Sequence, residues 1–130
     1  MSQNVLPMIG VDLVDNARIR RILDRGDDAF VRRVFTAKER AYCDAMADPV
    51  PHYAARFAAK EAVAKAFGTG IGGHAAFLDI EVSREPSGQP VIVLHGTAGS
   101  TASRLGVSCI RLSLSHTSDH AIAMVMLGGG

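Results

Sequence analysis

The 130-residue sequence predicts a single α+β domain, residues 1–130, with a mainly antiparallel sheet. Residues 53–67 are rich in alanine, the best helix former, and contain no helix breaker. After the glycine-rich residues 68–73 the hydrophobic period changes from 3.6 to 2, which indicates strands. The chain has no internal repeat, and its length is sufficient for one hydrophobic core.

The chain begins with a short buried strand at residues 8–14, where one carboxylate, Asp12, interrupts an apolar run. Asp15 or Asn16 can cap the helix that follows, because both side chains accept hydrogen bonds from backbone N–H groups. Gly26 is placed to end that helix.

Residues 27–34 favour a further short helix. Thr36 and Glu39 have the spacing of a capping box, so another helix should begin there and run to about Ala47. Residues 48–51 contain two prolines and break this helix before the central one.

The central helix carries charges at set spacings. Glu61 and Lys65 lie about 40° apart on one face, and Arg56 and Lys60 form a similar pair on a neighbouring face. Gly68 is placed to end the helix in a left-handed conformation. The apolar side consists of Phe57, Ala64 and Phe67.

Strands dominate the rest of the chain. The predicted elements are a strand at residues 79–83, a turn at 86–90, a strand at 91–95, a helix at 97–105, and strands at 108–116 and 121–127. The last strand is apolar on both faces, so it is either central or at a subunit interface. The expected order is strand, three helices, two strands, helix, two strands.

Composition narrows the class of protein. Apolar content of 48% and charged content of 21% are typical of a globular protein, and a net charge of +1 argues against a general polyanion binder. Residues 16–40 nevertheless hold eight basic and four acidic side chains, an excess that can steer an acidic partner.

Localisation is predicted to be cytoplasmic. The two cysteines lack metal-type spacing, which is typical of a reducing compartment. Residues 1–8 show no signal-peptide pattern, and the longest uncharged apolar run, residues 121–127, is too short to span a membrane.

Two carboxylates are candidates for a metal site. Asp12 inside an apolar strand is unusual because burial of an unpaired carboxylate is costly, although a cap or a salt bridge at a strand end explains it equally well. Together with Glu61 it would form an oxygen-rich site suited to Mg²⁺, which is typically held by one or two carboxylates, waters and substrate phosphates.

The glycine-rich residues 68–73 match the spacing of a dinucleotide-binding fingerprint, but they close a helix instead of opening one, so we reject that interpretation. Two interpretations remain open, a helix stop with a flexible linker and a loop whose backbone approaches a phosphate.

Among the five histidines, His116 ends a strand and is a candidate polar group at the rim of a pocket. His116, Asp119 and His120 lack a further ligand with suitable spacing, which disfavours a metal site there. The arginines of the first helix form either a solvated face or a docking surface, and the absence of interleaved aromatic residues argues against single-stranded nucleic acid.

Taken together, these residues resemble the holo-[acyl-carrier-protein] synthase family, the small 4′-phosphopantetheinyl transferases. The similar segments follow in family order and cover nearly the whole chain. They are Ile9-Gly10-Val11-Asp12-Leu13, Phe35-Thr36-Ala37-Lys38-Glu39, residues 56–72 beginning Arg56-Phe57-Ala58-Ala59-Lys60-Glu61, Asp79-Ile80-Glu81-Val82, and Leu114-Ser115-His116-Thr117.

The resemblance implies the transferase fold and a Mg²⁺-dependent enzyme of fatty acid biosynthesis. Such an enzyme transfers the 4′-phosphopantetheine arm of coenzyme A to a serine of an apo acyl carrier protein and releases adenosine 3′,5′-bisphosphate. Asp12 and Glu61 match the family's metal ligands, and Lys65 matches a catalytic lysine that contacts the pyrophosphate. The proton acceptor stays open between a metal-bound water, Glu61 acting through water, and His116.

The resemblance also implies a homotrimer with active sites between subunits, acting on protein and coenzyme and not on nucleic acid or membranes. It implies that the first helix docks the acidic carrier protein through Arg18, Arg21 and Arg25. The implied coenzyme A contacts are Arg56, Lys65, Gly68, Gly70, Gly88, Pro90, His116 and Thr117.

One segment departs from the family pattern. Many members carry basic residues before the central helix, whereas the only candidate basic residue at positions 47–52 here is His52. Arg56 and Lys60 are therefore the candidates to compensate in gripping the 3′-phosphate or the carrier protein on that side. Two alternatives to the transferase are a non-catalytic coenzyme A or nucleotide-phosphate binding module of the same fold and a docking subunit that uses only the first helix. The sequence leaves open which carrier protein is used and whether Mn²⁺ can replace Mg²⁺.

Overall fold

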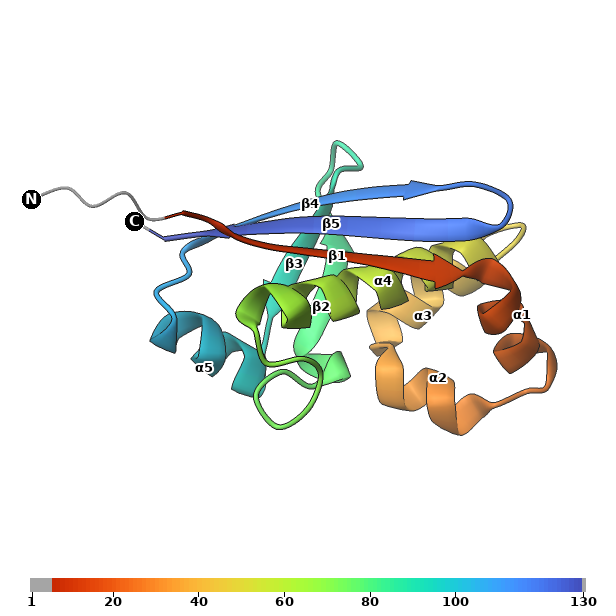
Figure 1. The fold of residues 1–130 in the computed structure, drawn as a ribbon. Coiled ribbons are helices and arrows are strands. Elements are labelled where there is room, and N and C mark those ends of the chain that lie inside the picture. Colours follow the sequence, from red (N-terminus) through yellow and green to blue (C-terminus); the bar gives the residue numbers. More distant parts are fainter. Residues whose placement is uncertain (1–5, 130) are drawn as a thin grey trace, which may run out of the picture.

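The computed structural model describes residues 6–129, so the expectation about a signal peptide at residues 1–8 lies mostly outside the described residues. The elements follow the α+β order expected from the sequence (Figure 1). They are β1 (Met8–Asp15), α1 (Asn16–Asp24), α2 (Asp28–Val34), α3 (Ala37–Asp44), α4 (Val50–Phe67), the 3₁₀ turn η1 (Phe77–Asp79), β2 (Ile80–Arg84), β3 (Pro90–Leu94), α5 (Gly96–Arg104), β4 (Cys109–His116) and β5 (His120–Gly128).

Four helices precede β2, so the count of three in the expected order is wrong, although the short helix predicted at residues 27–34 is present as α2. Asp27 caps α2 by accepting a hydrogen bond from the N–H of Phe30, and the chain leaves helical geometry at Phe35. The N-cap of α1 is Asp15, and the capping box of α3, formed by Thr36 and Glu39, is present as predicted.

The strands form two antiparallel sheets. The larger has the order β1-β5-β4, and β2 pairs with β3 in a hairpin. The apolar last strand, β5, is thus central, and Asp12 of β1 lies opposite Ala123 of β5. Helix α4 lies along one face of the larger sheet, with α1 to α3 toward one end of the molecule and α5 toward the other (Figure 1).

Small residues let β1 and α4 approach each other closely. A Cβ on Gly10 would lie 1.9 Å from the carbonyl oxygen of Ala62, so only glycine fits at this crossing. The helix begins at Val50, three residues before the predicted start, because Pro51 is tolerated in a first turn. Gly68 ends it with a left-handed φ of 81°.

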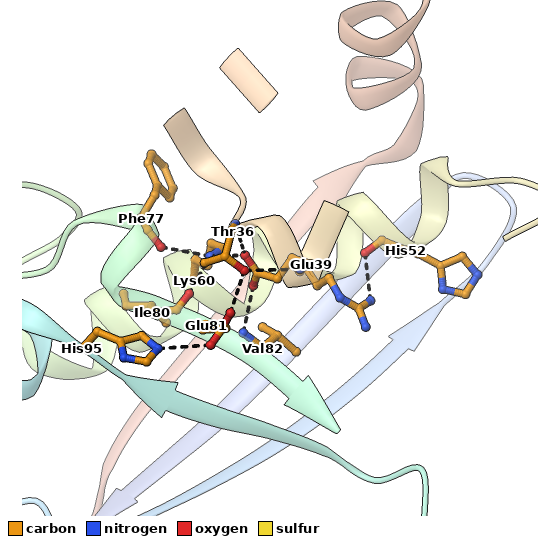
Figure 2. A network of polar contacts seen from close by, with 10 residues as sticks. Thr36, Glu39, His52, Lys60, Phe77, Ile80, Glu81, Val82 and His95 are labelled. Atoms are coloured by element: carbon orange, nitrogen blue, oxygen red, sulfur yellow. Dashed lines mark hydrogen bonds and ion pairs between the residues drawn. The ribbon is translucent and has the colours of Figure 1, made fainter. Parts of the chain in front are cut away.

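Helix α4 is buried almost all round, and the predicted charged face of Arg56 and Lys60 is buried with it. Lys60 makes an ion pair with Glu39 at 2.8 Å and donates to the carbonyl oxygens of Phe77 and Ile80. The other carboxylate oxygen of Glu39 accepts from the N–H of Val82 (Figure 2). This buried network ties α3, α4 and β2 together.

The face of the larger sheet that points away from α4 is apolar and exposed. Its exposed large side chains are Ile9, Val11, Leu13, Ile122, Met124 and Met126, with 39% to 67% of each accessible to solvent. Within residues 6–129 there is no helix of the length and hydrophobicity that crossing a membrane requires.

Candidate functional site

The structure brings Asp12, Glu61 and Lys65 together at the crossing of β1 and α4. The Nζ of Lys65 lies 2.8 Å from Oδ1 of Asp12 and also donates to the carbonyl oxygen of Val11 at 3.2 Å. The crossing is close because Gly10, two residues before Asp12, packs on the backbone of α4. Residues 49 positions apart in the sequence therefore form one cluster.

The two carboxylates of the cluster influence each other electrostatically. Burial raises the pKa of Glu61, the negative charge of Asp12 raises it further, and Lys65 and Arg18 oppose the shift. The hydrogen bond to Asp12 raises the pKa of Lys65, so this side chain is a stable ammonium group. Arg18 of α1 thus lies within electrostatic range of the cluster.

The donor set fits Mg²⁺. Asp12 and Glu61 supply hard carboxylate oxygens, and the ammonium group held at Asp12 shows that a cation is favoured there. Within residues 6–129, no three or more His, Cys, Asp or Glu side chains gather closely enough to hold a metal ion by themselves. A metal at Asp12 and Glu61 would thus complete its coordination with water and substrate oxygens, as Mg²⁺ commonly does.

In the glycine loop after α4, the backbone N–H groups of two glycines bond to the last turn of the helix. Gly68 and Gly70 both have left-handed φ angles, 81° and 68°. Their N–H groups donate to the carbonyl oxygens of Lys65 and Ala64, so both are engaged in closing the helix. The helix-stop interpretation accounts for these bonds, and contact of the two glycines with coenzyme A stays a prediction.

His116 and Thr117 line a pocket of about 500 Å³ at the end of β4, together with Asn16 and Pro51 among others. Asn16 is buried, and its side-chain amide donates to the carbonyl oxygens of Thr117 and Ser118, which holds the turn after β4 against α1. Sequence reasoning treated Asn16 only as a possible helix cap and missed this role, because its partners are about a hundred residues away.

The remaining predicted coenzyme contacts lie around α3, α4 and the hairpin. Gly88 has a φ of 93° in the turn between β2 and β3, and Pro90 begins β3. Arg56 is only 3% exposed and stacks on the ring of Tyr42, with 4.2 Å between Cζ and the ring centroid. Lys60 is fully buried, so the hypothesis that it grips a phosphate is wrong.

The three arginines of the predicted docking surface are exposed. Arg18 and Arg21 lie on α1, and Arg25 follows its C-terminal end. Arg18 lies over the ring of Phe57, with 5.4 Å between Cζ and the ring centroid, and Arg25 pairs with Asp27 at 3.2 Å. Arg21 forms no ion pair with another described residue. Of the three arginines, Arg18 is thus the one that acts electrostatically on Glu61, and the other two lie farther along the helix.

Comparisons with known proteins identify the family of the chain. The family model "4′-phosphopantetheinyl transferase superfamily" matches residues 8–125. The chain is 46% identical over 118 residues to a holo-[acyl-carrier-protein] synthase of Koribacter versatilis, which covers 91% of this chain and 94% of that protein. It is 48% identical over 124 residues to one of Anaeromyxobacter sp., with 93% and 94% covered.

Solved structures are similar as well. The crystal structure of holo-[acyl-carrier-protein] synthase from Neisseria meningitidis has a TM-score of 0.87 at 34% identity and covers 95% of this chain and 99% of that one. The Helicobacter pylori enzyme, solved in complex with coenzyme A, has a TM-score of 0.82 at 33% identity, with 93% and 100% covered.

Proposed function

The chain belongs to the 4′-phosphopantetheinyl transferase superfamily, within the holo-[acyl-carrier-protein] synthase family, and from this we propose that it transfers 4′-phosphopantetheine from coenzyme A to a serine of an apo acyl carrier protein. The observation that carries the proposal is the convergence of Asp12, Glu61 and Lys65 at one crossing of β1 and α4. A protein that only bound the coenzyme would have no use for this set.

The reaction breaks the phosphoanhydride bond of coenzyme A and forms a phosphodiester between the serine and pantetheine. The serine hydroxyl oxygen attacks the phosphorus that bears pantetheine, and the bond from that phosphorus to the bridging oxygen breaks. Adenosine 3′,5′-bisphosphate leaves with the bonding electrons, and the serine proton passes to a base. Such transfers depend mainly on positioning and on neutralising charge.

Lys65 supplies positive charge at this site. Its ammonium group is held by Asp12 and the carbonyl of Val11, so it is oriented before substrate binds. We assign Lys65 to the pyrophosphate, where it stabilises the negative charge that develops on the leaving group.

Asp12 and Glu61 would hold Mg²⁺, and the bound ion would polarise the attacked phosphate. For the serine proton we favour Glu61 acting through a water, since its pKa is raised by burial and by Asp12. His116 is less suitable because it lines the separate pocket with Asn16 and Thr117.

We further propose a homotrimer with active sites between subunits. The exposed apolar face of β1 and β5 is of the kind that proteins bury in interfaces. A groove on this face is lined by Ile9, Val11, Met124, Met126 and also Lys65, so the apolar face extends to the proposed active site. His116, Thr117 and the Gly88–Pro90 turn would reach the adenosine end from a neighbouring subunit.

The carrier protein would dock on α1 through Arg18, Arg21 and Arg25, since acyl carrier proteins are acidic and these side chains are exposed. We place the enzyme in the cytoplasm, in fatty acid biosynthesis, and the two free cysteines are compatible with a reducing compartment.

Incubation with coenzyme A, Mg²⁺ and an apo carrier protein tests the proposal. We expect the carrier to gain the mass of phosphopantetheine, and we expect Asp12→Asn and Glu61→Gln to abolish the gain and weaken Mg²⁺ binding in calorimetry. Glu85→Gln, which removes an exposed carboxylate on the hairpin, is the matched control. Coenzyme binding without any transfer to several carriers would instead identify a binding module.

A further inference from the structure

We propose that Asn16 and Arg20 of α1 are positioning residues that set the affinity for the adenosine end of coenzyme A. One turn apart on the helix, they hold the two walls of a pocket of about 500 Å³. His116 and Thr117 line this pocket and are proposed contacts of the adenosine end, so the inference rests on the proposed function.

The first wall of the pocket is the turn between β4 and β5, which Asn16 binds at three successive carbonyl groups. The backbone N–H of Asn16 donates to the carbonyl oxygen of Asp119 at 2.8 Å. Its side-chain amide donates to the carbonyl oxygens of Thr117 at 3.2 Å and Ser118 at 3.3 Å. Figure 1 shows this turn and the start of α1 at the same end of the molecule. A residue that is only 5% exposed therefore fixes the turn to the helix.

The amide of Asn16 is held in one orientation, because only its NH₂ group can donate to the two carbonyl oxygens. Its Oδ1 is buried and has no hydrogen-bond partner among residues 6–129. An unsatisfied buried acceptor costs free energy, and an apolar side chain would fill the same space without that cost. The contribution of Asn16 is therefore the placement of the turn and not the stability of the core.

The turn keeps its own shape through Thr117. The hydroxyl oxygen of Thr117 accepts from the N–H groups of Asp119 at 3.2 Å and His120 at 3.1 Å. The N–H of Thr117 donates to the carbonyl oxygen of His120 at 2.8 Å. Because the turn is held internally, Asn16 determines where it lies as a unit. A shift of the turn would move Thr117 together with the adjacent His116.

The second wall is the connection between α3 and α4, which Arg20 binds through Asp48. The Nη2 of Arg20 lies 2.9 Å from Oδ2 of Asp48, and the other oxygen of Asp48 accepts from the N–H of Val50, the first residue of α4, at 3.2 Å. The hydrogen bond from Arg20 lowers the pKa of Asp48, and the bond from Val50 lowers it further, so this carboxylate is charged at neutral pH. Asp48 thus joins α1 to the start of α4 beside Pro51, which also lines the pocket.

Helix α1 separates this task from the proposed docking of the carrier protein. Asn16 and Arg20 lie about 40° apart around the helix, so both face the pocket. Arg18 and Arg21 lie about 160° and about 140° from Asn16, on the opposite side. A change at Asn16 or Arg20 should therefore act on the coenzyme and leave the docking arginines in place.

Calorimetric titration with coenzyme A and with adenosine 3′,5′-bisphosphate, which contains only the adenosine end, tests the inference. We expect Asn16→Ala to lower the affinity for both by about tenfold, because the turn is no longer fixed to α1. Arg20→Gln should lower both by about threefold, since its pair with Asp48 is half exposed. In transfer assays the loss should appear in the KM for coenzyme A, with kcat within about twofold of the wild type.

Two variants control for a purely structural effect. Thr101→Ala removes another buried side chain that donates to a distant backbone carbonyl, that of His74 at 2.6 Å. We expect it to lower the melting temperature, as Asn16→Ala does, and to leave the affinity for both ligands unchanged. Arg32→Gln breaks an exposed pair with Asp28 and is the control for Arg20→Gln.

Equal affinity of the wild type and Asn16→Ala for adenosine 3′,5′-bisphosphate would overturn the inference. An equal loss of affinity with Thr101→Ala would also overturn it, because the loss would then follow stability and not the position of the turn. Arg20 is exposed, so Arg20→Gln tests the second wall even where Asn16→Ala does not fold. If no carrier gains phosphopantetheine while Asn16→Ala still weakens coenzyme binding, the proposed function fails and the inference stands.

Discussion

Lys60 and Glu39 form an ion pair at 2.8 Å in which neither side chain is exposed to solvent. The pair joins α4 to α3, and the further bonds of Glu39 to the N–H groups of Thr36 and Val82 extend it to β2. Burial lowers the pKa of Lys60, and Glu39 counteracts this shift. The residue that the sequence suggested as a phosphate ligand is thus part of the core.

Removal of one partner of this pair should be strongly destabilising, because it leaves a buried charge without compensation. We expect Lys60→Met to lower the free energy of unfolding by about 3–5 kcal/mol in urea denaturation. Asp28→Asn is the control, since it breaks the exposed pair with Arg32 and should cost less than about 0.5 kcal/mol. A small effect of Lys60→Met would mean that the lysine is neutral or hydrated in solution.

Gly10 sets the distance between the strand that carries Asp12 and the helix that carries Glu61. A Cβ there would lie 1.9 Å from Ala62 O, so we expect Gly10→Ala to destabilise the protein by about 3 kcal/mol and to reduce transfer by displacing Asp12. Gly72→Ala is the matched control because no atom lies within 4 Å of its added Cβ and its φ is not positive. Equal stability of the two variants in thermal melting would contradict the close crossing.

Local sequence patterns predicted most of the helices and strands. The Thr36 and Glu39 capping box, the left-handed Gly68 and the alternation of β4 depend on neighbours in the chain, so their spacing predicted them. The environment of Lys60 depends on Glu39 and on the carbonyl of Ile80, twenty or more positions away. No helical period distinguishes a solvated lysine from a buried one that has such partners.

The candidate site was likewise only partly predictable from the sequence. Asp12, Glu61 and Lys65 were predicted from their residue types and the resemblance, but their proximity follows from the β1–α4 crossing. In the pocket between α3, α4 and β2, the resemblance indicated Arg56, but Tyr42 and Arg84 were not predicted, because they come from other elements and meet Arg56 only in the folded chain.

The raised pKa of Glu61 makes stability depend on pH. Its pKa is above the ordinary value of 4.5 in the folded protein, so folding favours the protonated form, and stability falls as pH rises from about that value through the folded-state pKa. Without added metal, we expect Glu61→Gln to melt at a higher temperature than the wild type at neutral pH. The difference should vanish in acid, where both side chains are neutral.

Thermal melting from about pH 4 to about pH 8 measures this difference. Glu85→Gln, at an exposed glutamate, should show no such trend. A wild type that is more stable than Glu61→Gln at neutral pH would contradict the assigned environment of Glu61.

The exposed apolar face of β1 and β5 predicts that the subunits associate through it. Met124 is 53% exposed at the centre of this face, so we expect Met124→Glu to convert the proposed trimer to monomers and to abolish transfer. Val93→Glu introduces the same charge at a residue of β3, 38% exposed, and should leave the assembly intact. Sedimentation velocity measures both, and a monomeric wild type would overturn the proposed trimer.

The arginines of α1 predict how the carrier protein is bound. Arg18 lies close enough to Glu61 to affect the carboxylate cluster, so Arg21→Glu and Arg25→Glu are the cleaner tests of docking. We expect each to raise the KM for the carrier by about tenfold and to flatten its dependence on salt, since exposed charge pairs act on encounter and are screened. The KM for coenzyme A should stay unchanged. Arg104→Glu on α5, at the other end of the molecule, should leave both constants as they are (Figure 1). A change in the KM for coenzyme A with Arg21→Glu would place the coenzyme, and not the carrier, on this helix.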